Sequence, residues 1–300
     1  MGFYEYFSKL VDSSYRHRLK RPQKTTIRIT WKAPEDIIER LEAYGYKLQR
    51  LPRYERGYRI IEGDASRIGN LLEYALGYIY LQEGASMIPP VVLKPERGDK
   101  ILDLCAAPGS KTTQMADMIE NEGVIVANDV NKYRLRMLGS NVQRTSAYSV
   151  IVTSFDGRNI PKSLYGKFDK TLVDAPCSAL GTRRFPDNLD KRSLEFSLSI
   201  SKLQYRLLRS AILATKPGGR IVYSTCTLTV EENEFVVDRI LEEFDFVEVE
   251  KISVEGLRYS PGVTEREGWS LDERLKNTIR IYPRHNDTDG FYIASLIRSE

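Results

Sequence analysis

Three cysteines, Cys105, Cys177 and Cys226, lie far apart in this 300-residue sequence, and no two of them form a Cys-X-X-Cys pair. An odd number of cysteines at such spacing disfavours a disulfide framework. The sequence has only two histidines, His17 and His285, and both lie near its ends, so we expect no metal site. Any function of the thiols is therefore expected to be chemical.

Polar or reactive residues follow each of five short apolar segments in the second part of the chain. In chain order they are the loop 105–111, Asp129, Asp156, the motif DAPCS at 174–178 and the motif STCT at 224–227. In an open parallel sheet, ligands bind outside the carboxyl ends of the strands. A single Asp at a strand end is often a helix N-cap, but five such positions together indicate one binding site.

The loop after the first segment carries neither of the common phosphate-binding patterns. It lacks GxGxxG, which disfavours a nicotinamide cofactor, and it lacks GxxxxGK[ST]. An acid about twenty residues later, Asp129, could accept both hydroxyls of a ribose, and Asp156 could accept from an adenine amino group. With a helix N-terminus and Lys111 for a carboxylate-bearing tail, the set favours S-adenosylmethionine. Lys111 could instead be an ordinary solvated lysine. The loop residues are Cys105, Ala106, Ala107, Pro108, Gly109, Ser110 and Lys111.

Cys177 and Cys226 follow neighbouring predicted strands, so both thiols are expected to face one pocket. C5 of cytosine is a poor nucleophile, but a thiolate that adds to C6 turns the ring into an enamine whose C5 can attack an electrophilic methyl group. Asp174 could bind the N3/N4 edge of the base and favour this adduct by general acid catalysis. Cys105, inside an apolar run, is expected to be a small core side chain.

From residue 100 onward, strands of four to seven residues, rich in β-branched side chains, alternate with helical stretches. This alternation predicts an α/β fold with a Rossmann-like, doubly wound parallel sheet. The last apolar segment, 290–298, is expected to add one antiparallel strand at the edge of the sheet.

The first ninety residues have a mixed pattern that predicts a small α+β module at 25–90, preceded by a helical, basic extension at 1–24 and followed by the main domain at 91–300. Residues 1–60 contain 14 Lys and Arg against 7 Asp and Glu, whereas the whole chain has a net charge of +4. Tyrosines alternate with these cations, as suits phosphate contacts and base stacking, although a solubilising face is an equally good explanation.

These motifs resemble the Sun-type family of RNA cytosine-C5 methyltransferases, and the resemblance covers nearly the whole chain from about residue 25. Asp129 and Asp156 also match. The chain departs from the family pattern at Ser110 and Ala179, where glycine is common. The other matching stretches are YLQEGASMIPP (80–90), DLCAAPGSKT (103–112), DAPCSALGT (174–182), STCTLTVEENE (224–234) and the terminal DGFYIASLI.

The resemblance implies that Cys226 is the nucleophile and that Cys177 assists proton loss and product release. It also implies that residues 105–111, Asp129, Asp156 and Asp174 contact S-adenosylmethionine, with Asp174 reaching the cytosine as well. The module at 25–90 would be the family's RRM-like, RNA-binding element.

Two other functions fit parts of the pattern. One is a catalytically inactive RNA-binding assembly factor, which the presence of both cysteines disfavours. The other is a DNA cytosine methyltransferase, whose nucleophile would lie in the Pro-Cys motif itself. No apolar run approaches the ~20 residues of a membrane span. We therefore expect a cytoplasmic, monomeric enzyme that acts on tRNA or, second, on rRNA.

Overall fold

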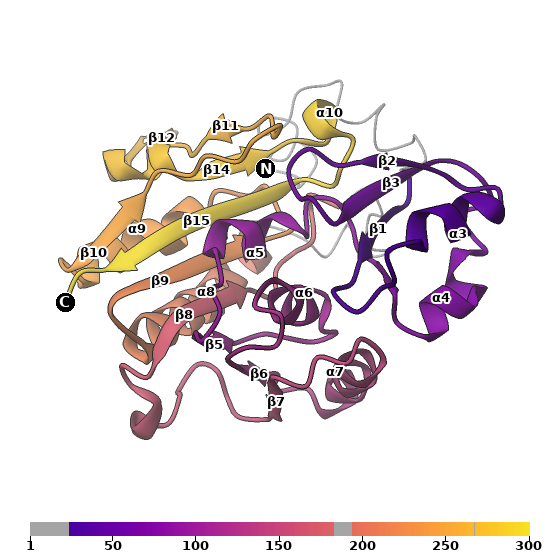
Figure 1. Ribbon diagram of the computed structural model, residues 1–300. Helices are drawn as coiled ribbons and strands as arrows, with labels where there is room; N and C mark the ends of the chain where they lie inside the picture. The colour runs from indigo at the N-terminus through magenta and orange to yellow at the C-terminus, as the bar shows by residue number, and fades with distance from the viewer. Residues whose placement is uncertain (1–23, 183–193, 267) are drawn as a thin grey trace.

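Five strands between residues 100 and 225 pair in parallel in the order β7-β6-β5-β8-β9, and helices alternate with them along the chain. A computed structural model describes residues 24–182, 194–266 and 268–300 (Figure 1). The predicted Rossmann-like α/β fold is confirmed. The elements of this part are α5 (Ile88–Leu93), β5 (Lys100–Asp103), α6 (Ser110–Met118), β6 (Val124–Asn128), α7 (Lys132–Arg144), β7 (Val150–Thr153), the short 3-10 helix η2 (Lys162–Leu164), β8 (Phe168–Asp174), α8 (Leu194–Ala214), β9 (Thr215–Thr225) and α9 (Glu234–Glu243).

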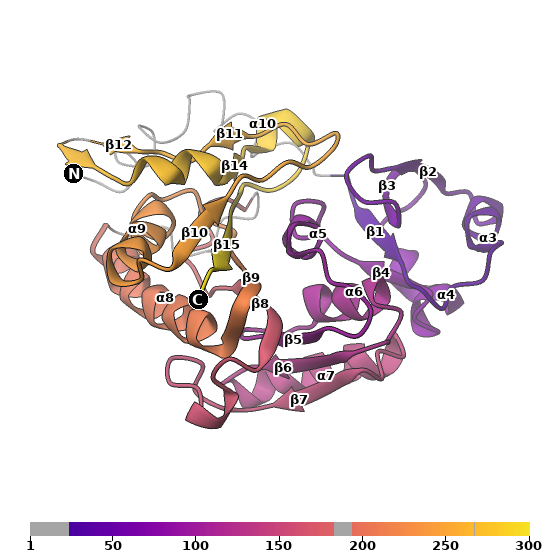
Figure 2. The same cartoon turned by 60° about the vertical axis from the view of Figure 1, so that its left-hand side comes forward.

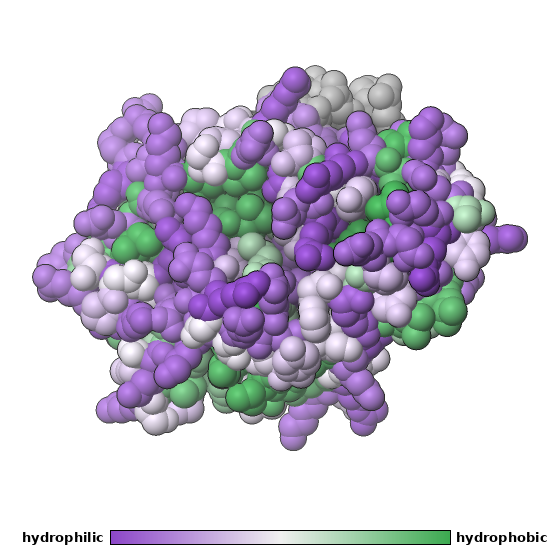
Figure 3. Space-filling view, in the orientation of Figure 1, coloured by the Kyte–Doolittle hydropathy of each residue, from purple (hydrophilic) through white to green (hydrophobic). Residues whose placement is uncertain are grey.

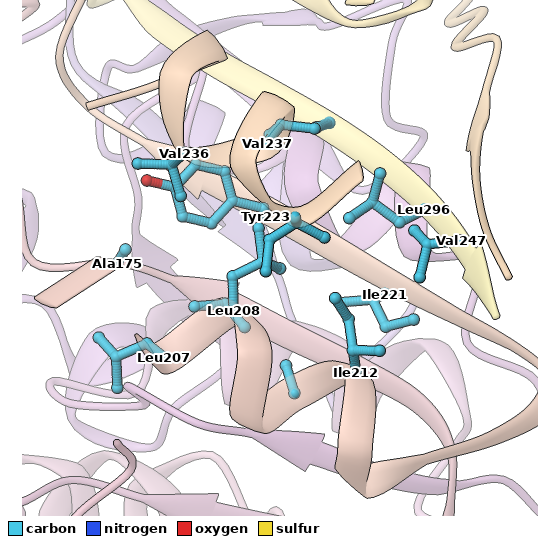
Figure 4. Packing of buried hydrophobic residues seen from close by; sticks show 14 of the residues in the cluster. Ala175, Leu207, Leu208, Ile212, Ile221, Tyr223, Val236, Val237, Val247 and Leu296 are labelled. Atoms are coloured by element: carbon cyan, nitrogen blue, oxygen red, sulfur yellow. The ribbon is translucent and has the colours of Figure 1, made fainter. Parts of the chain in front are cut away.

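Helices cover both faces of this sheet, with α8 and α9 on one face and α5, α6 and α7 on the other (Figure 2). The apolar positions of the helices repeat at helical spacing, so each helix buries one stripe against the strands. Figure 4 shows Leu207 and Leu208 of α8 and Val237 of α9 packed with Ile221 and Tyr223 of β9. The buried strands leave only their carboxyl ends available to a ligand.

The C-terminal part of the chain extends the sheet with antiparallel strands. β15 (Phe291–Arg298) pairs with β9 on one side and with β10 and β14 on the other, so the expectation of an antiparallel strand is right but its place at the edge is wrong. Its central residues are buried on both faces for that reason. The remaining elements are β10 (Val247–Glu250), β11 (Ser260–Pro261), β12 (Glu265–Arg266), β13 (Trp269–Ser270), the 3-10 helix η4 (Glu273–Asn277), β14 (Ile279–Ile281) and α10 (Pro283–Asn286).

The N-terminal module contains a second sheet, in which four antiparallel strands take the order β2-β3-β1-β4. Its buried face is apolar and includes Ile27, Leu41 and Ile60. In both ribbon views the module lies beside α6 (Figures 1 and 2). The basic extension predicted at 1–24 lies outside the described residues except for Lys24. The module's elements are β1 (Thr26–Ile29), α3 (Ile37–Ala43), β2 (Lys47–Arg50), β3 (Gly57–Glu62), the 3-10 helix η1 (Ile68–Asn70), α4 (Leu72–Ala75) and β4 (Ile79–Leu81).

Candidate active site

The loop 105–111 connects β5 to the N-terminus of α6 through a tight turn at Gly109. Gly109 has φ of 105°, in the left-handed region that favours glycine, and a Cβ there would lie 2.8 Å from Cδ1 of Leu138 in α7. Ser110 therefore begins the helix, and glycine is required one residue earlier. The buried Ala106 and Ala107 keep the turn narrow. Backbone N–H groups at this helix N-terminus are free of side-chain capping and suit a carboxylate.

Asp129 follows β6, and its hydrogen bonds connect the carboxyl end of β6 to the loop that follows β5. Its carboxylate accepts from the backbone N–H of Ala107 (3.3 Å) and of Asn131 (2.8 Å), and it forms an ion pair with Arg134 (3.2 Å). Only 3% of the residue is exposed. The carboxylate is thus fixed against the cofactor loop, where it can accept from ribose hydroxyls. A glycine turn, a helix N-terminus and this acid together fit the nucleoside and amino-acid ends of S-adenosylmethionine.

Asp156, at the end of β7, is less closely tied to the other predicted residues. Both of its carboxylate oxygens accept from the guanidinium of Arg158, at distances of 2.7–3.0 Å, and these hydrogen bonds hold the pKa of Asp156 below its usual value. The structure places it at the correct edge of the sheet but gives it an arginine partner that the sequence did not predict.

Lys111 is buried, so it is not the ordinary solvated lysine that the sequence left open as an alternative. Its ammonium donates to Asp174 (2.7 Å) and to the hydroxyl of Ser86 (2.7 Å), and it lies 5.3 Å from the ring centroid of Phe291. Ser224 donates to the other oxygen of Asp174 (2.8 Å). Asp174 is therefore oriented by hydrogen bonds from two sides.

Cys177 and Cys226 come together because β8 and β9 pair side by side, with Asp174 opposite Ser224. The two sulfur atoms lie 3.1 Å apart in a thiol–thiol hydrogen bond. That hydrogen bond, followed by burial, raises the pKa of Cys177 well above its ordinary value. The prediction that both thiols face one pocket is thus supported by their direct contact.

The backbone around the thiols leaves little freedom. Gly181 donates its N–H to the carbonyl of Cys226 (2.9 Å), and a Cβ at Gly181 would lie 2.5 Å from the carbonyl oxygen of Gly290, so no other residue fits. Ala179 has φ of 59°, a left-handed conformation in which the family's usual glycine is less strained. The departure at Ala179 therefore costs backbone energy.

Glu232 was not singled out by the sequence, although it lies inside the motif STCTLTVEENE. It is fully buried and accepts from the backbone N–H of Ser178 (2.8 Å) in the loop that carries Cys177. Further donors are Thr229 (3.0 Å), Ser197 (2.9 Å) and Gln204 (3.2 Å). Ser178 and Thr227 also share a hydroxyl hydrogen bond of 2.8 Å. These contacts lock the two thiol loops together.

Asp103 is another missed residue and lies at the end of β5. It accepts from Thr112 (2.7 Å), its second oxygen has no hydrogen-bond partner among the described residues, and burial raises its pKa to about 7. Asp103, Ser86 and Ser224 all lie inside motifs that the sequence analysis quoted. Their hydroxyl and carboxylate groups beside reactive residues could have marked them, but the hydrogen-bond partners of the two serines lie far away in the sequence.

Cys105 lies apart from the other two thiols and packs at the margin of the main apolar cluster. Burial raises the pKa of its thiol, which suits the expected role as a core side chain. Among the described residues, no cluster of three or more His, Cys, Asp or Glu side chains could hold a metal ion. In that same part of the chain, no helix combines the length and apolarity needed to cross a membrane.

Comparisons with known proteins show the family to which the chain belongs. A family model described as 16S rRNA methyltransferase RsmB/F matches residues 90–297. A curated relative, the tRNA (cytosine(49)-C(5))-methyltransferase of Pyrococcus abyssi, is 42% identical over 296 residues, which cover 97% of this chain and 94% of the relative. The Ribosomal RNA small subunit methyltransferase F of Shewanella sp. (strain ANA-3) is 38% identical over 285 residues, which cover 93% of this chain but only 57% of that longer protein.

A solved structure shares the architecture. The methyltransferase homolog protein from Pyrococcus horikoshii superposes with a TM-score of 0.86 at 33% identity, over 99% of this chain and 94% of the other. The family model covers well over half of the chain, and the structural superposition agrees with the sequence matches. The chain therefore belongs to the RsmB/F family of Sun-type, S-adenosylmethionine-dependent RNA cytosine-C5 methyltransferases.

Proposed function

We propose that this protein methylates C5 of a cytosine in tRNA, with Cys226 as the nucleophile. The observation that carries the proposal is the contact of Cys177 and Cys226, 3.1 Å apart, beside an Asp174 that Lys111 and Ser224 hold in place. The choice of tRNA over rRNA rests on the named tRNA relative, which matches this chain over almost its full length, whereas the rRNA relative is much longer.

In this mechanism the Cys226 thiolate adds to C6 of the cytosine, and Asp174 binds the N3/N4 edge of the base. S-adenosylmethionine, when bound, supplies the electrophilic methyl group that C5 attacks. A base then takes the C5 proton in a transfer that Cys177 assists, the C5–H electron pair re-forms the C5–C6 double bond, and the bond between Sγ and C6 breaks to restore the Cys226 thiolate.

We assign the assistance of proton loss and release to Cys177. Its sulfur touches that of Cys226, so it lies beside the C5–C6 bond once the adduct has formed. The hydrogen bond to Cys226, followed by burial, raises the pKa of the Cys177 thiol. The cofactor-binding set under this proposal is residues 105–111, Asp129, Asp156 and Asp174. We also propose that the enzyme works in the cytoplasm as a monomer without a metal ion.

The substrate is tested by incubating the protein with tritiated S-adenosylmethionine and, in separate reactions, tRNA, rRNA and DNA. We expect label in tRNA, located at cytosine by bisulfite sequencing. Label in rRNA but not in tRNA would contradict the choice of tRNA. Label only in DNA, or in no nucleic acid, would contradict RNA methylation and support a DNA enzyme or an inactive RNA-binding factor respectively.

The thiol roles are tested with Cys226→Ala and Cys177→Ala. We expect Cys226→Ala to abolish methylation, because no nucleophile remains to activate C5. Cys177→Ala should instead trap a covalent protein–RNA adduct, visible on a denaturing gel. Cys105→Ala, which removes the third thiol, serves as the comparison and should form no trapped adduct. An adduct with Cys226→Ala but not with Cys177→Ala would reverse the two assignments.

A further inference from the structure

The segment 131–153, which contains α7 and β7, carries charge of one sign only. It includes four Lys and Arg residues and no Asp or Glu. Two of these cations have structural roles. Arg134 pairs with Asp129, and Arg144 donates to the carbonyl oxygens of Tyr74 (2.9 Å) and Ile79 (3.1 Å) in the N-terminal module. The other two, Lys132 and Arg136, form no ion pair with any part of the chain that the structure describes.

Lys132 and Arg136 share one exposed face of α7 with Tyr133 and Met137, because residues three and four apart lie on the same side of a helix. Tyr133 is 79% exposed and Met137 is 51% exposed. The guanidinium of Arg136 lies 5.8 Å from the ring centroid of Tyr133. An exposed ring beside two unpaired cations can stack a nucleobase while the cations contact its phosphates.

The α7 face is continuous with the cofactor loop at one side. The helix begins three residues beyond Asp129, and Arg134 donates to the carbonyl of Ala107. The Asn141 side chain donates to the carbonyl of Pro108 (2.9 Å). Substrate bound at the carboxyl ends of the strands would therefore lie close to the first turn of α7.

The same helix meets the N-terminal module at its other end. Lys32 of the module donates to the carbonyl of Arg144 (2.9 Å) and to Ser146 (2.9 Å), and Trp31 packs edge-on against Tyr148 at 6.1 Å between ring centroids. Figure 1 shows α7 below the module and next to α6, and Figure 3 shows a largely hydrophilic surface there. The module, α7 and the site thus form a continuous path.

We propose that the exposed face of α7 is a second contact surface for the substrate RNA, where Lys132 and Arg136 bind phosphates and Tyr133 stacks a base. We infer that RNA binds here because all charged residues of the segment 131–153 are cations, which complement the phosphates of RNA. The surface is also continuous with both the site and the module. This inference rests on the proposed RNA methylation and adds to it the part of the protein that holds RNA outside the reacting base.

The first test reverses the charge of both side chains in the double variant Lys132→Glu/Arg136→Glu. We expect the KM for RNA to rise about tenfold or more, with kcat at saturating RNA and the dissociation constant for S-adenosylmethionine unchanged. The slope of log KM against log salt should become shallower by roughly 1–2, because two phosphate contacts are lost. Neither change should unfold the helix, because both side chains are exposed.

The matched control is Lys162→Glu/Lys167→Glu, which changes the net charge equally. These lysines are exposed and precede β8, at the amino edge of the sheet opposite the site. We expect the KM of this control to stay within about twofold of wild type. An equal rise in both double variants, or no rise in the α7 variant, would overturn the inference.

The second test addresses stacking. Tyr133→Ala should raise the KM for RNA roughly tenfold, and Tyr133→Phe, which keeps the ring, should restore it. A Tyr133→Phe variant as weak as Tyr133→Ala would overturn the stacking role. A wild-type sedimentation profile that shows a dimer broken by Tyr133→Ala would assign the face to a second copy instead.

If the wild-type protein methylates RNA and all α7 variants match it, only this inference fails. If wild type methylates no RNA, the proposed function fails first.

Discussion

Glu232 is a buried carboxylate whose hydrogen-bond partners, within the part of the chain that the structure describes, include no cation. Its oxygens accept from a backbone N–H in the Cys177 loop and from side chains on both sides of it. Burial of a charge is costly unless hydrogen bonds replace its water. The donors around Glu232 do so, and the result is a fixed separation between two loops that each carry a thiol. Its position next to Cys177 also adds negative charge that raises the pKa of that thiol.

We predict that Glu232→Ala loses about 2–4 kcal/mol of unfolding free energy, because the Ser178 N–H and other donors remain buried without an acceptor. Its kcat should fall far more than the KM for either substrate changes, because thiol placement is disturbed and binding is not. Glu232→Gln should recover most of the stability, since the surrounding hydroxyls can accept from its amide. Urea unfolding and steady-state kinetics measure both effects.

The neighbouring Glu231 supplies the control for this prediction. It is also buried, but among the described residues its side chain forms no hydrogen bond with either thiol loop, and one of its oxygens has no hydrogen-bond partner there. Glu231→Ala should leave kcat near the wild-type value. Equal losses of kcat in Glu231→Ala and Glu232→Ala would show that any cavity at this site is harmful and would remove the special role of Glu232.

At the scale of elements, the strand ends were predictable and their partners were not. Each reactive residue follows an apolar run of strand length, so the sequence places 105–111, Asp129, Asp156, Asp174 and Cys226 at one edge of a sheet. The contact of Lys111 with Asp174 spans 63 positions and depends on how α6 packs over β8. No local pattern contains that information, so Lys111 was expected at the cofactor tail and is found bound to Asp174.

The short strands that the sequence did not predict have weak hydrophobic patterns. β2 has the sequence KLQR and no fully buried residue, so it shows no apolar alternation, and it forms because β3 offers an unpaired edge. β14 has only three residues. Strands of this kind are stabilised by tertiary pairing, which also explains why β15 lies inside the sheet: β10 and β14 cover the edge that it was expected to form.

At the scale of the whole molecule, a buried cation connects the N-terminal module to the methyltransferase domain. Arg28 of β1 forms an ion pair with Asp117 of α6 and donates to Gln82 (3.0 Å) and to Thr113 (2.8 Å). Thr113 in turn donates to the carbonyl of Gly109 (2.8 Å), in the turn before α6. Burial lowers the pKa of Arg28 to about 10, so the guanidinium is still charged at neutral pH. The module is therefore fixed to the helix that begins in the loop 105–111.

This connection makes a prediction about stability that a double-mutant cycle can measure. Arg28→Met should cost about 3–5 kcal/mol of unfolding free energy, because Asp117 is left as a buried charge without its partner. Asp117→Asn alone should also destabilise, since it leaves Arg28 uncompensated. The double variant Arg28→Met/Asp117→Asn should be more stable than the sum of the single losses by about 2 kcal/mol or more. Urea unfolding of the four proteins gives the coupling. Strictly additive losses would mean that the two side chains act independently.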